Sequence, residues 1–152
     1  MQVRSARNHW RIEMFDTIAP TYDILNHLLS AGIDKSWRKK GIQAIRAKRP
    51  KKILDIATGT GDLAILANKI LQPEEIIGID ISEKMLQIAI QKAQAEGAAN
   101  IQFLHGDCMN LHFPENAFDA VTVAFGVRNF EKLEQGLQEI LRVLKPDGQL
   151  MI

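Results

Sequence analysis

Residues 54–62 read Leu54-Asp55-Ile56-Ala57-Thr58-Gly59-Thr60-Gly61-Asp62, and this stretch decides the fold. A short apolar run ends in a turn that holds Gly59 and Gly61, and an amphipathic segment follows. Glycine accepts backbone conformations that other residues disfavour, so the turn can be tight and a ligand can approach its backbone closely. A strand, a glycine turn and a helix in this order are typical of folds that bind nucleotide-like cofactors. The alternative for this motif alone is an ordinary strand–helix turn.

The same alternation continues toward the C-terminus. Five β-rich runs are separated by segments of helical spacing, and they lie at 53–57, 76–80, 101–104, 119–125 and 148–152. The first, second and fourth runs are nearly continuously apolar, as in strands that are covered on both faces. We therefore predict an α/β fold of the Rossmann-like type, with a mostly parallel sheet and helices on both of its faces.

Three amphipathic helices are predicted between these strands. Their apolar faces are Leu63, Ala64, Ala67, Ile70 and Leu71, then Met85, Leu86, Ala89 and Ala93, then Leu133, Leu137, Ile140, Leu141 and Leu144. Ser82 is expected to cap the second helix and Gly97 to end it. The stretch Pro146-Asp147-Gly148 is expected to end the third helix in a turn.

Residues 1–50 are predicted to form an N-terminal helical segment on the core of residues 51–152, within one structural domain. Two apolar clusters mark its helices, with a break at Gly32 and an end at Pro50. The clusters are Leu25, Leu28 and Leu29, and then Trp37, Ile42 and Ile45.

Composition restricts the class of protein. The chain has 152 residues, of which 46% are apolar and 24% charged, as in one globular domain. A net charge of +1 excludes a nucleic-acid-binding protein that is positively charged over its whole length, although a local basic patch stays possible. The single cysteine, Cys108, excludes an internal disulfide and suits a reducing compartment. Since no apolar run approaches the roughly 18 residues of a membrane span and the first ten residues lack a signal-peptide core, we expect a cytoplasmic protein.

Ligands of parallel sheets bind beyond the carboxyl ends of the strands, and Asp80 ends the second run. A carboxylate there can accept hydrogen bonds from both hydroxyls of a ribose, and together with the glycine turn it indicates a cofactor that contains adenosine. The alternative for Asp80 is a cap or turn acid before Ser82. Asp55 would repel the pyrophosphate of NAD. S-adenosyl-L-methionine has no phosphate and carries a sulfonium and an ammonium, so it is the predicted cofactor. No metal site is expected.

The third and fourth strand ends supply further candidates. Asp107 is placed to hold the adenine amino group while Cys108 or Met109 packs on the ring, and the alternative for Asp107 is a solvated loop acid. Arg128 and Asn129 would face the crevice after the fourth strand, where Arg128 can hold an oxyanion. The alternative for Arg128 is an ion pair with a nearby surface glutamate.

Several stretches resemble the ubiquinone/menaquinone biosynthesis C-methyltransferases, a family of class I S-adenosylmethionine-dependent methyltransferases. The stretch 54–62 is similar to the first motif of the whole class. Residues 14–23, Met14-Phe15-Asp16-Thr17-Ile18-Ala19-Pro20-Thr21-Tyr22-Asp23, and residues 125–129, Phe125-Gly126-Val127-Arg128-Asn129, resemble that family more specifically. Residues 141–148 resemble the segment before its fifth strand, so the resemblance covers about residues 14 to 152.

The resemblance implies where the cofactor contacts fall. They are Thr60 in the glycine turn, Asp80 for the ribose, and Asp107 with Cys108 beside the adenine; Asp55, Gly59 and Gly61 complete the cofactor set. Ala124 stands where the family often has a serine, which removes a hydroxyl. Ala57 stands where the general motif has its first glycine, and a residue this small should still fit.

The implied reaction is methyl transfer to a ring carbon of a reduced, prenylated naphthoquinone. Arg128 and Asn129 are the expected catalytic residues, because they can bind the ring oxygens and favour a phenolate. Arg128 is not expected to act as a free base, since its pKa stays above ~12. His27 and Asp23 are further candidates from the N-terminal helices.

A prenylated quinol lies in a bilayer, so transient contact with a membrane surface is implied. Residues 35–52 hold nine Lys or Arg and no acid, which favours anionic lipid, although a solvated helix face is the alternative. No aromatic and basic pattern indicates nucleic acid.

The resemblance also implies a seven-stranded sheet, and the last strands are expected to be missing from this chain. Cofactor binding is therefore expected to survive, and methyl transfer by this chain is expected to be weak or absent. An open sheet edge would permit a homo-oligomer. Two alternatives to the implied function stay open, namely a methyltransferase for another small acceptor and a non-catalytic module that binds the cofactor.

Overall fold

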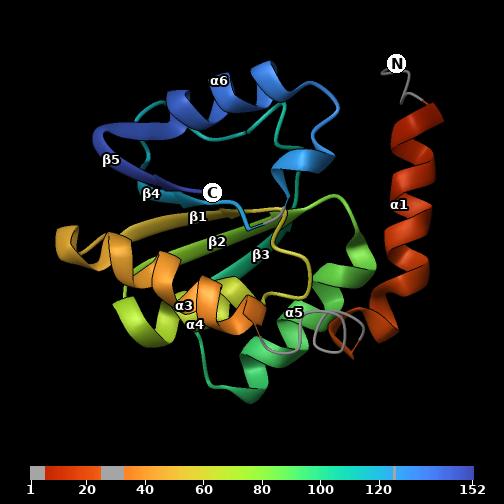
Figure 1. Ribbon diagram of the computed structural model, residues 1–152, viewed down its shortest axis with the longest axis horizontal. Helices are drawn as coiled ribbons and strands as arrows, with labels where there is room; N and C mark the ends of the chain where they lie inside the picture. Colours follow the sequence, from red (N-terminus) through yellow and green to blue (C-terminus); the bar gives the residue numbers. More distant parts are fainter. Residues whose placement is uncertain (1–5, 25–32, 125) are drawn as a thin grey trace.

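A computed structural model describes residues 6–24, 33–124 and 126–152. One sheet of parallel strands lies at its centre (Figure 1). The strands are β1 (Lys52–Ile56), β2 (Glu75–Asp80), β3 (Ile101–His105), β4 (Phe118–Thr122) and β5 (Leu144–Met151). Their order is β3-β2-β1-β4-β5, so the order reverses between β1 and β4. This is the doubly wound α/β architecture that the sequence predicts.

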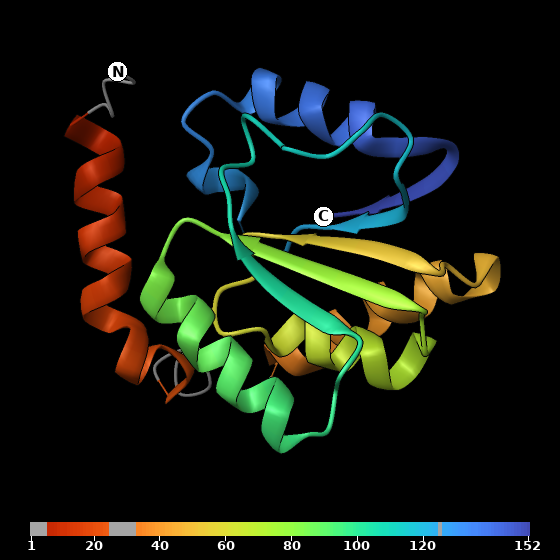
Figure 2. The same cartoon turned by 180° about the vertical axis from the view of Figure 1, so that it is seen from behind.

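Helices cover both faces of the sheet (Figures 1 and 2). One face carries α3 (Ile33–Ile45), α4 (Asp62–Leu71) and α5 (Glu83–Ala95), and the other carries α6 (Leu133–Val143). The N-terminal helix α1 (Ala6–Ile18) lies beside α5 in both views. Three short 3-10 helices follow α1, α3 and β4: η1 (Ala19–Thr21), η2 (Arg46–Lys48) and η3 (Val127–Asn129).

The central strand β1 divides its side chains between the two faces. Ile53 packs in the apolar cluster beneath α3, α4 and α5, whereas Leu54 and Ile56 pack in the cluster beneath α6. Because side chains alternate along a strand, Asp55 points to the same face as Ile53. The carboxylate therefore lies within reach of α3 and α4.

The predicted cap of α5 is confirmed. The Ser82 hydroxyl accepts a hydrogen bond from the backbone N–H of Met85 at 3.2 Å. The four residues predicted for the apolar face of this helix are all buried, and they are Met85, Leu86, Ala89 and Ala93.

The predicted apolar face of α3 is wrong in one residue. Ile42 and Ile45 are buried, but Trp37 is 62% exposed. Arg38, four positions before Ile42 and seven before Ile45, takes the inward position instead, and only 14% of its side chain is exposed. Helical spacing explains this, since residues four and seven apart share a face and residues five apart do not. The cluster Leu25, Leu28 and Leu29 lies outside the described residues.

The predicted third helix and fifth strand also need correction. Leu133 and Leu141 are 49% and 65% exposed, whereas Gly136, Ile140 and Val143 are buried. Strand β5 begins at Leu144 rather than at Gly148. The predicted turn at 146–148 is an irregularity inside the strand, because Phe118 pairs with Leu144 and Ala120 pairs with Gln149. Pairing of β5 with β4 thus begins at Leu144, before Pro146, which was predicted to end the preceding helix in a turn.

Within the described part of the chain, no helix combines the length and the apolar character needed to cross a membrane.

Candidate functional site

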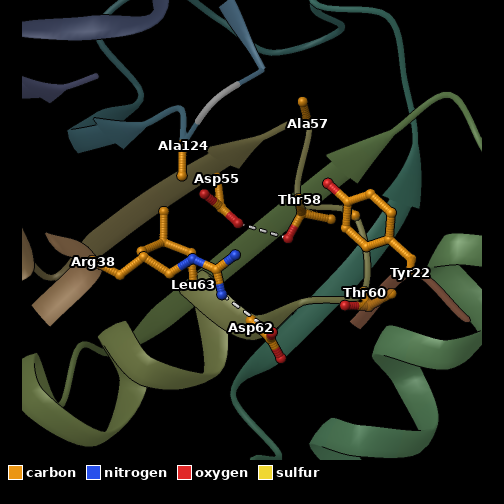
Figure 3. Close-up of a pocket in the computed structure, with 10 residues that line it drawn as sticks. Tyr22, Arg38, Asp55, Ala57, Thr58, Thr60, Asp62, Leu63 and Ala124 are labelled. Atoms are coloured by element: carbon orange, nitrogen blue, oxygen red, sulfur yellow. Dashed lines mark hydrogen bonds and ion pairs between the residues drawn. The ribbon is translucent and has the colours of Figure 1, made fainter. Parts of the chain in front are cut away.

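A small open pocket lies over the carboxyl end of β1, between the glycine turn, α3 and the segment that follows η1 (Figure 3). It is lined by Tyr22, Arg38, Asp55, Ala57, Thr58, Gly59, Thr60, Asp62, Leu63 and Ala124. The pocket lies next to the point where the strand order reverses, which is where ligands bind in folds of this kind.

The two glycines of the turn serve different purposes. Both have positive φ, +56° at Gly59 and +82° at Gly61. At Gly61 a Cβ atom would lie 2.9 Å from the Ala89 side chain and 2.9 Å from the Phe103 ring, so this glycine lets α4 and α5 approach the sheet. At Gly59 the nearest atom to such a Cβ is Tyr22 Cε1, 4.0 Å away. Gly59 is therefore the backbone position that a ligand can approach.

Ala57 fits the place of the usual first glycine, as predicted, although its φ is +54°. This left-handed conformation is costly for a residue with a side chain. The Ala57 methyl group requires a glycine opposite it, because a Cβ on Gly126 would lie 2.5 Å from the Cβ of Ala57.

Asp55 is a buried carboxylate on the floor of the pocket. Its Oδ2 accepts a hydrogen bond from the Thr58 hydroxyl at 2.6 Å, and its Oδ1 accepts one from the Thr122 hydroxyl at 2.6 Å. Burial raises the pKa of Asp55 to about 6, against the lowering effect of these hydroxyls and of Arg38. The pocket floor thus holds an acid that gains from a nearby cation.

Asp80 ties the end of β2 to the glycine turn. Its Oδ2 accepts the backbone N–H of Gly59 at 2.8 Å, and its Oδ1 accepts that of Ser82 at 2.9 Å. Burial raises the pKa of Asp80, and these backbone hydrogen bonds oppose the rise. The backbone N–H of Ile81 bonds the same carboxylate. A carboxylate has about four acceptor sites, so Asp80 can still accept a hydroxyl of a ligand.

A polar network holds the N-terminal segment over the turn. Lys92 of α5 forms ion pairs with Asp23, at 2.8 Å, and with Asp62. The Thr60 hydroxyl donates to Asp23 Oδ1 at 2.6 Å. Although burial opposes it, the pairing with Asp23 and Asp62 raises the pKa of Lys92.

A second contact fixes the same segment to the cap of α5, since the Ser82 hydroxyl donates to Asp16 Oδ1 at 2.5 Å. Residues 16–23 are therefore joined both to the glycine turn and to the start of the helix after β2.

The structure brings together the predicted cofactor residues of β1, of the glycine turn and of β2. Asp55, Gly59 and Thr60 line the pocket, and Asp80 is bonded to Gly59. Gly61 is the N-cap residue of α4, immediately beside the pocket.

The other two predicted cofactor residues belong to the loop after β3. Asp107 accepts the backbone N–H of Met109 at 2.9 Å, and Cys108 packs against the apolar cluster beneath α6. Both are described residues, and neither lines the pocket over β1. Their contact with an adenine ring stays a prediction.

The predicted catalytic residues follow β4 directly. Arg128 and Asn129 belong to η3, and the Asn129 side chain is exposed. The side chain of Arg128 and the whole of His27 lie outside the described residues. Binding of a ring oxygen by Arg128 and Asn129 stays a prediction.

Sequence reasoning missed Tyr22, Arg38, Asp62 and Lys92 as residues of this site. Asp62 had a signal, because it follows the glycine turn directly. Arg38 had one too, because its spacing to Ile42 and Ile45 places it on the inward face of α3. No sequence signal pointed to Lys92, because its two partners, Asp23 and Asp62, lie in distant segments of the chain.

The family model described as the ubiE/COQ5 methyltransferase family matches residues 2–152. The chain belongs to this family.

Proteins of this family from several bacteria are close relatives. The demethylmenaquinone methyltransferase of Bacteroides fragilis is 56% identical over 141 residues, which cover 92% of this chain and 58% of that protein. The Thermus thermophilus enzyme of the same name is 49% identical over 139 residues, covering 91% and 63%. The chain thus spans about three fifths of the length of these relatives.

Solved structures of methyltransferases share the fold of this ubiE/COQ5 family member. A putative methyltransferase from Bacillus halodurans has a TM-score of 0.70 at 27% identity, covering 76% of this chain and 49% of that one. A SAM-dependent methyltransferase from Aquifex aeolicus has a TM-score of 0.59 at 27% identity, covering 63% and 52%. The predicted class I methyltransferase fold is confirmed.

Proposed function

We propose that this chain binds S-adenosyl-L-methionine in the pocket over β1 and serves the C-methylation of a prenylated quinol. The observation that carries the proposal is the Asp80 carboxylate, which accepts the backbone N–H of Gly59, the glycine of the turn that a ligand can approach. A ribose whose hydroxyls donate to Asp80 would place the rest of the cofactor across the glycine turn.

The charges around the pocket fit this cofactor. Asp55 and Asp62 line it, and Asp62 occupies the first turn of α4, where a phosphate would otherwise find the positive end of the helix. A dinucleotide would bring its pyrophosphate against these acids. S-adenosylmethionine brings a sulfonium and an ammonium, which acids stabilise.

The chemistry divides between the cofactor and the chain. When bound, S-adenosylmethionine supplies a methyl group on a cationic sulfur; the methyl–carbon bond forms as the sulfur–methyl bond breaks, and the ring carbon releases its proton. The chain's residues position the ring and favour its phenolate. Arg128 and Asn129, directly after β4, are the groups proposed to bind the ring oxygens.

The acceptor is proposed from the relatives. Two of them are named as demethylmenaquinone methyltransferases, and a relative from Geotalea daltonii, 45% identical over 142 residues, is named as a ubiquinone/menaquinone biosynthesis C-methyltransferase. A reduced naphthoquinone with a prenyl tail is accordingly the proposed substrate.

A substrate with a prenyl tail requires contact with a membrane surface, and α3 has a suitable outer face. Trp37 is 62% exposed, and the exposed lysines Lys35, Lys39 and Lys40 flank it. Lysine attracts anionic lipid and tryptophan favours the interface between lipid and water. The opposite, inward face of the same helix carries Arg38, which lines the pocket, so α3 connects this outer face to the site.

Transfer of labelled methyl groups tests the proposed function. The chain is incubated with methyl-labelled S-adenosylmethionine and demethylmenaquinol, and the quinone is extracted and counted against reactions without acceptor. Label in the quinone fraction above the acceptor-free background, even at a low rate, would support the proposed function. Binding of the cofactor without transfer would favour a cofactor-binding module, and label in other small acceptors would favour a different methyltransferase.

A further inference from the structure

Arg38 is a cation placed inside the pocket by the packing of α3. It lies on the inward face of the helix with Ile42 and Ile45, and only 14% of its side chain is exposed. Figure 3 shows its guanidinium reaching from α3 across the pocket toward the glycine turn. Among the described residues that line the pocket, Arg38 is the only one with a basic side chain.

The ion pair between Arg38 and Asp62 leaves Arg38 able to bind a second anion. Arg38 Nη1 lies 3.1 Å from Asp62 Oδ2, while the other oxygen of Asp62 pairs with Lys92. If an anion bound Arg38, Asp62 would keep its contact with Lys92. The guanidinium is a planar fork of donors that matches the two oxygens of a carboxylate.

The cofactor has one anionic group, the carboxylate of its amino-acid end. With the ribose at Asp80, on the β2 side of the turn, the amino-acid end would extend to the β1 side, where Arg38 and Asp55 lie. The carboxylate would meet the guanidinium, and the two cationic groups would lie near Asp55 and Asp62.

From this arrangement we infer that Arg38 binds the carboxylate of S-adenosylmethionine. The inference rests on the proposed function, because it assumes that this cofactor occupies the pocket. It adds a specific contact, which selects ligands that carry an amino-acid carboxylate over adenosine compounds that lack one.

The test compares S-adenosylmethionine with its decarboxylated analogue, which keeps the sulfonium and the ammonium and lacks only the carboxylate. Affinities are measured by calorimetry for the wild-type chain, for Arg38→Gln, for Arg38→Lys and for the control Lys39→Gln. Lys39 is the next residue of α3 and is exposed. Circular dichroism checks that each variant is folded.

Arg38→Gln is expected to weaken binding of S-adenosylmethionine by about 10- to 100-fold, the usual effect of losing a charge-assisted hydrogen bond. It should leave the affinity for the decarboxylated analogue unchanged. Arg38→Lys should recover part of the loss, and Lys39→Gln should bind both ligands like the wild type.

A purely structural role gives a different pattern. If Arg38 only pairs with Asp62, Arg38→Gln weakens the binding of both ligands equally, and this result overturns the inference. If Arg38→Gln does not fold, Arg38→Lys decides: a lower affinity for S-adenosylmethionine with an unchanged affinity for the analogue supports the direct contact, and an equal loss for both ligands overturns it. A wild-type chain that binds neither ligand would overturn the proposed function as well.

Discussion

At the scale of single residues, the carboxylate of Asp55 combines burial with two hydroxyl donors. Burial raises its pKa from 3.8 to about 6, so the folded chain holds this proton more tightly than the unfolded chain. The stabilising contribution is therefore fully present below pH 3.8 and is lost as the pH rises through about 6.

Replacing Asp55 by asparagine should remove this loss. The amide can still bond both threonine hydroxyls, since a hydroxyl donates as well as accepts. Relative to the wild type, the unfolding free energy of Asp55→Asn should rise by about 2 kcal/mol between pH 4 and pH 7. Urea unfolding of both proteins at several pH values measures the difference. A difference that does not change with pH would show that Asp55 is not the buried acid described above.

The pair Ala57 and Gly126 gives a second prediction at this scale. Gly126→Ala should destabilise the chain by about 1–3 kcal/mol, because its Cβ would lie 2.5 Å from that of Ala57. In an Ala57→Gly background the same substitution should cost clearly less, since the opposing methyl group is gone. A double-mutant cycle from thermal or urea unfolding measures this coupling. Additive effects would mean that the two residues do not meet.

At the scale of elements, the attachment of the N-terminal segment depends on Lys92, which reaches Asp23 from α5. Lys92→Gln should weaken that attachment by up to ~1 kcal/mol, as expected of a partly exposed ion pair. Amide hydrogen exchange in residues 6–24 should then be several-fold faster, and exchange in β1 and β2 should not change.

Lys69→Gln is a matched control for this measurement. Lys69 forms an ion pair with Glu96 on the outer side of α4, and 53% of its side chain is exposed. If both variants exchange like the wild type in residues 6–24, Lys92 does not hold the segment in place.

At the scale of the whole molecule, the sequence predicted the layers and the strand-end site but not the contacts between distant segments. The glycine turn and the apolar runs fix β1, β2 and β4 locally, because strand periodicity and turn chemistry are short-range signals. The ion pairs of Asp62 with Arg38 and Lys92, and of Lys92 with Asp23, were not predicted. These side chains come from distant segments of the chain and meet only when the helices pack. The start of β5 was predicted too late, because Pro146 and Gly148 favour a turn. In the structure the hydrogen bonds between β5 and β4 outweigh this local preference.

The outer face of α3 gives a prediction for the molecule as a whole. Lys39→Gln combined with Lys40→Gln should weaken binding to vesicles containing phosphatidylglycerol by roughly 10-fold or more, since each lysine near an anionic surface contributes ~1 kcal/mol. Co-sedimentation measures the binding, with phosphatidylcholine vesicles as the neutral reference. The control is Lys69→Gln with Lys84→Gln, two exposed lysines on α4 and α5. Equal loss in both double variants would place the lipid contact elsewhere.

Calorimetric titration of S-adenosylmethionine into the wild-type chain and into Asp80→Ala tests the central claim most directly. Asp80 is expected to accept the ribose hydroxyls, and a buried hydroxyl without a partner costs ~1–3 kcal/mol. We expect the wild type to bind, and folded Asp80→Ala to bind with an affinity about 10-fold or more lower. Asp147→Ala, at an exposed acid, should bind like the wild type. Equal affinities of the wild type and Asp80→Ala, or no binding by the wild type, would contradict this claim.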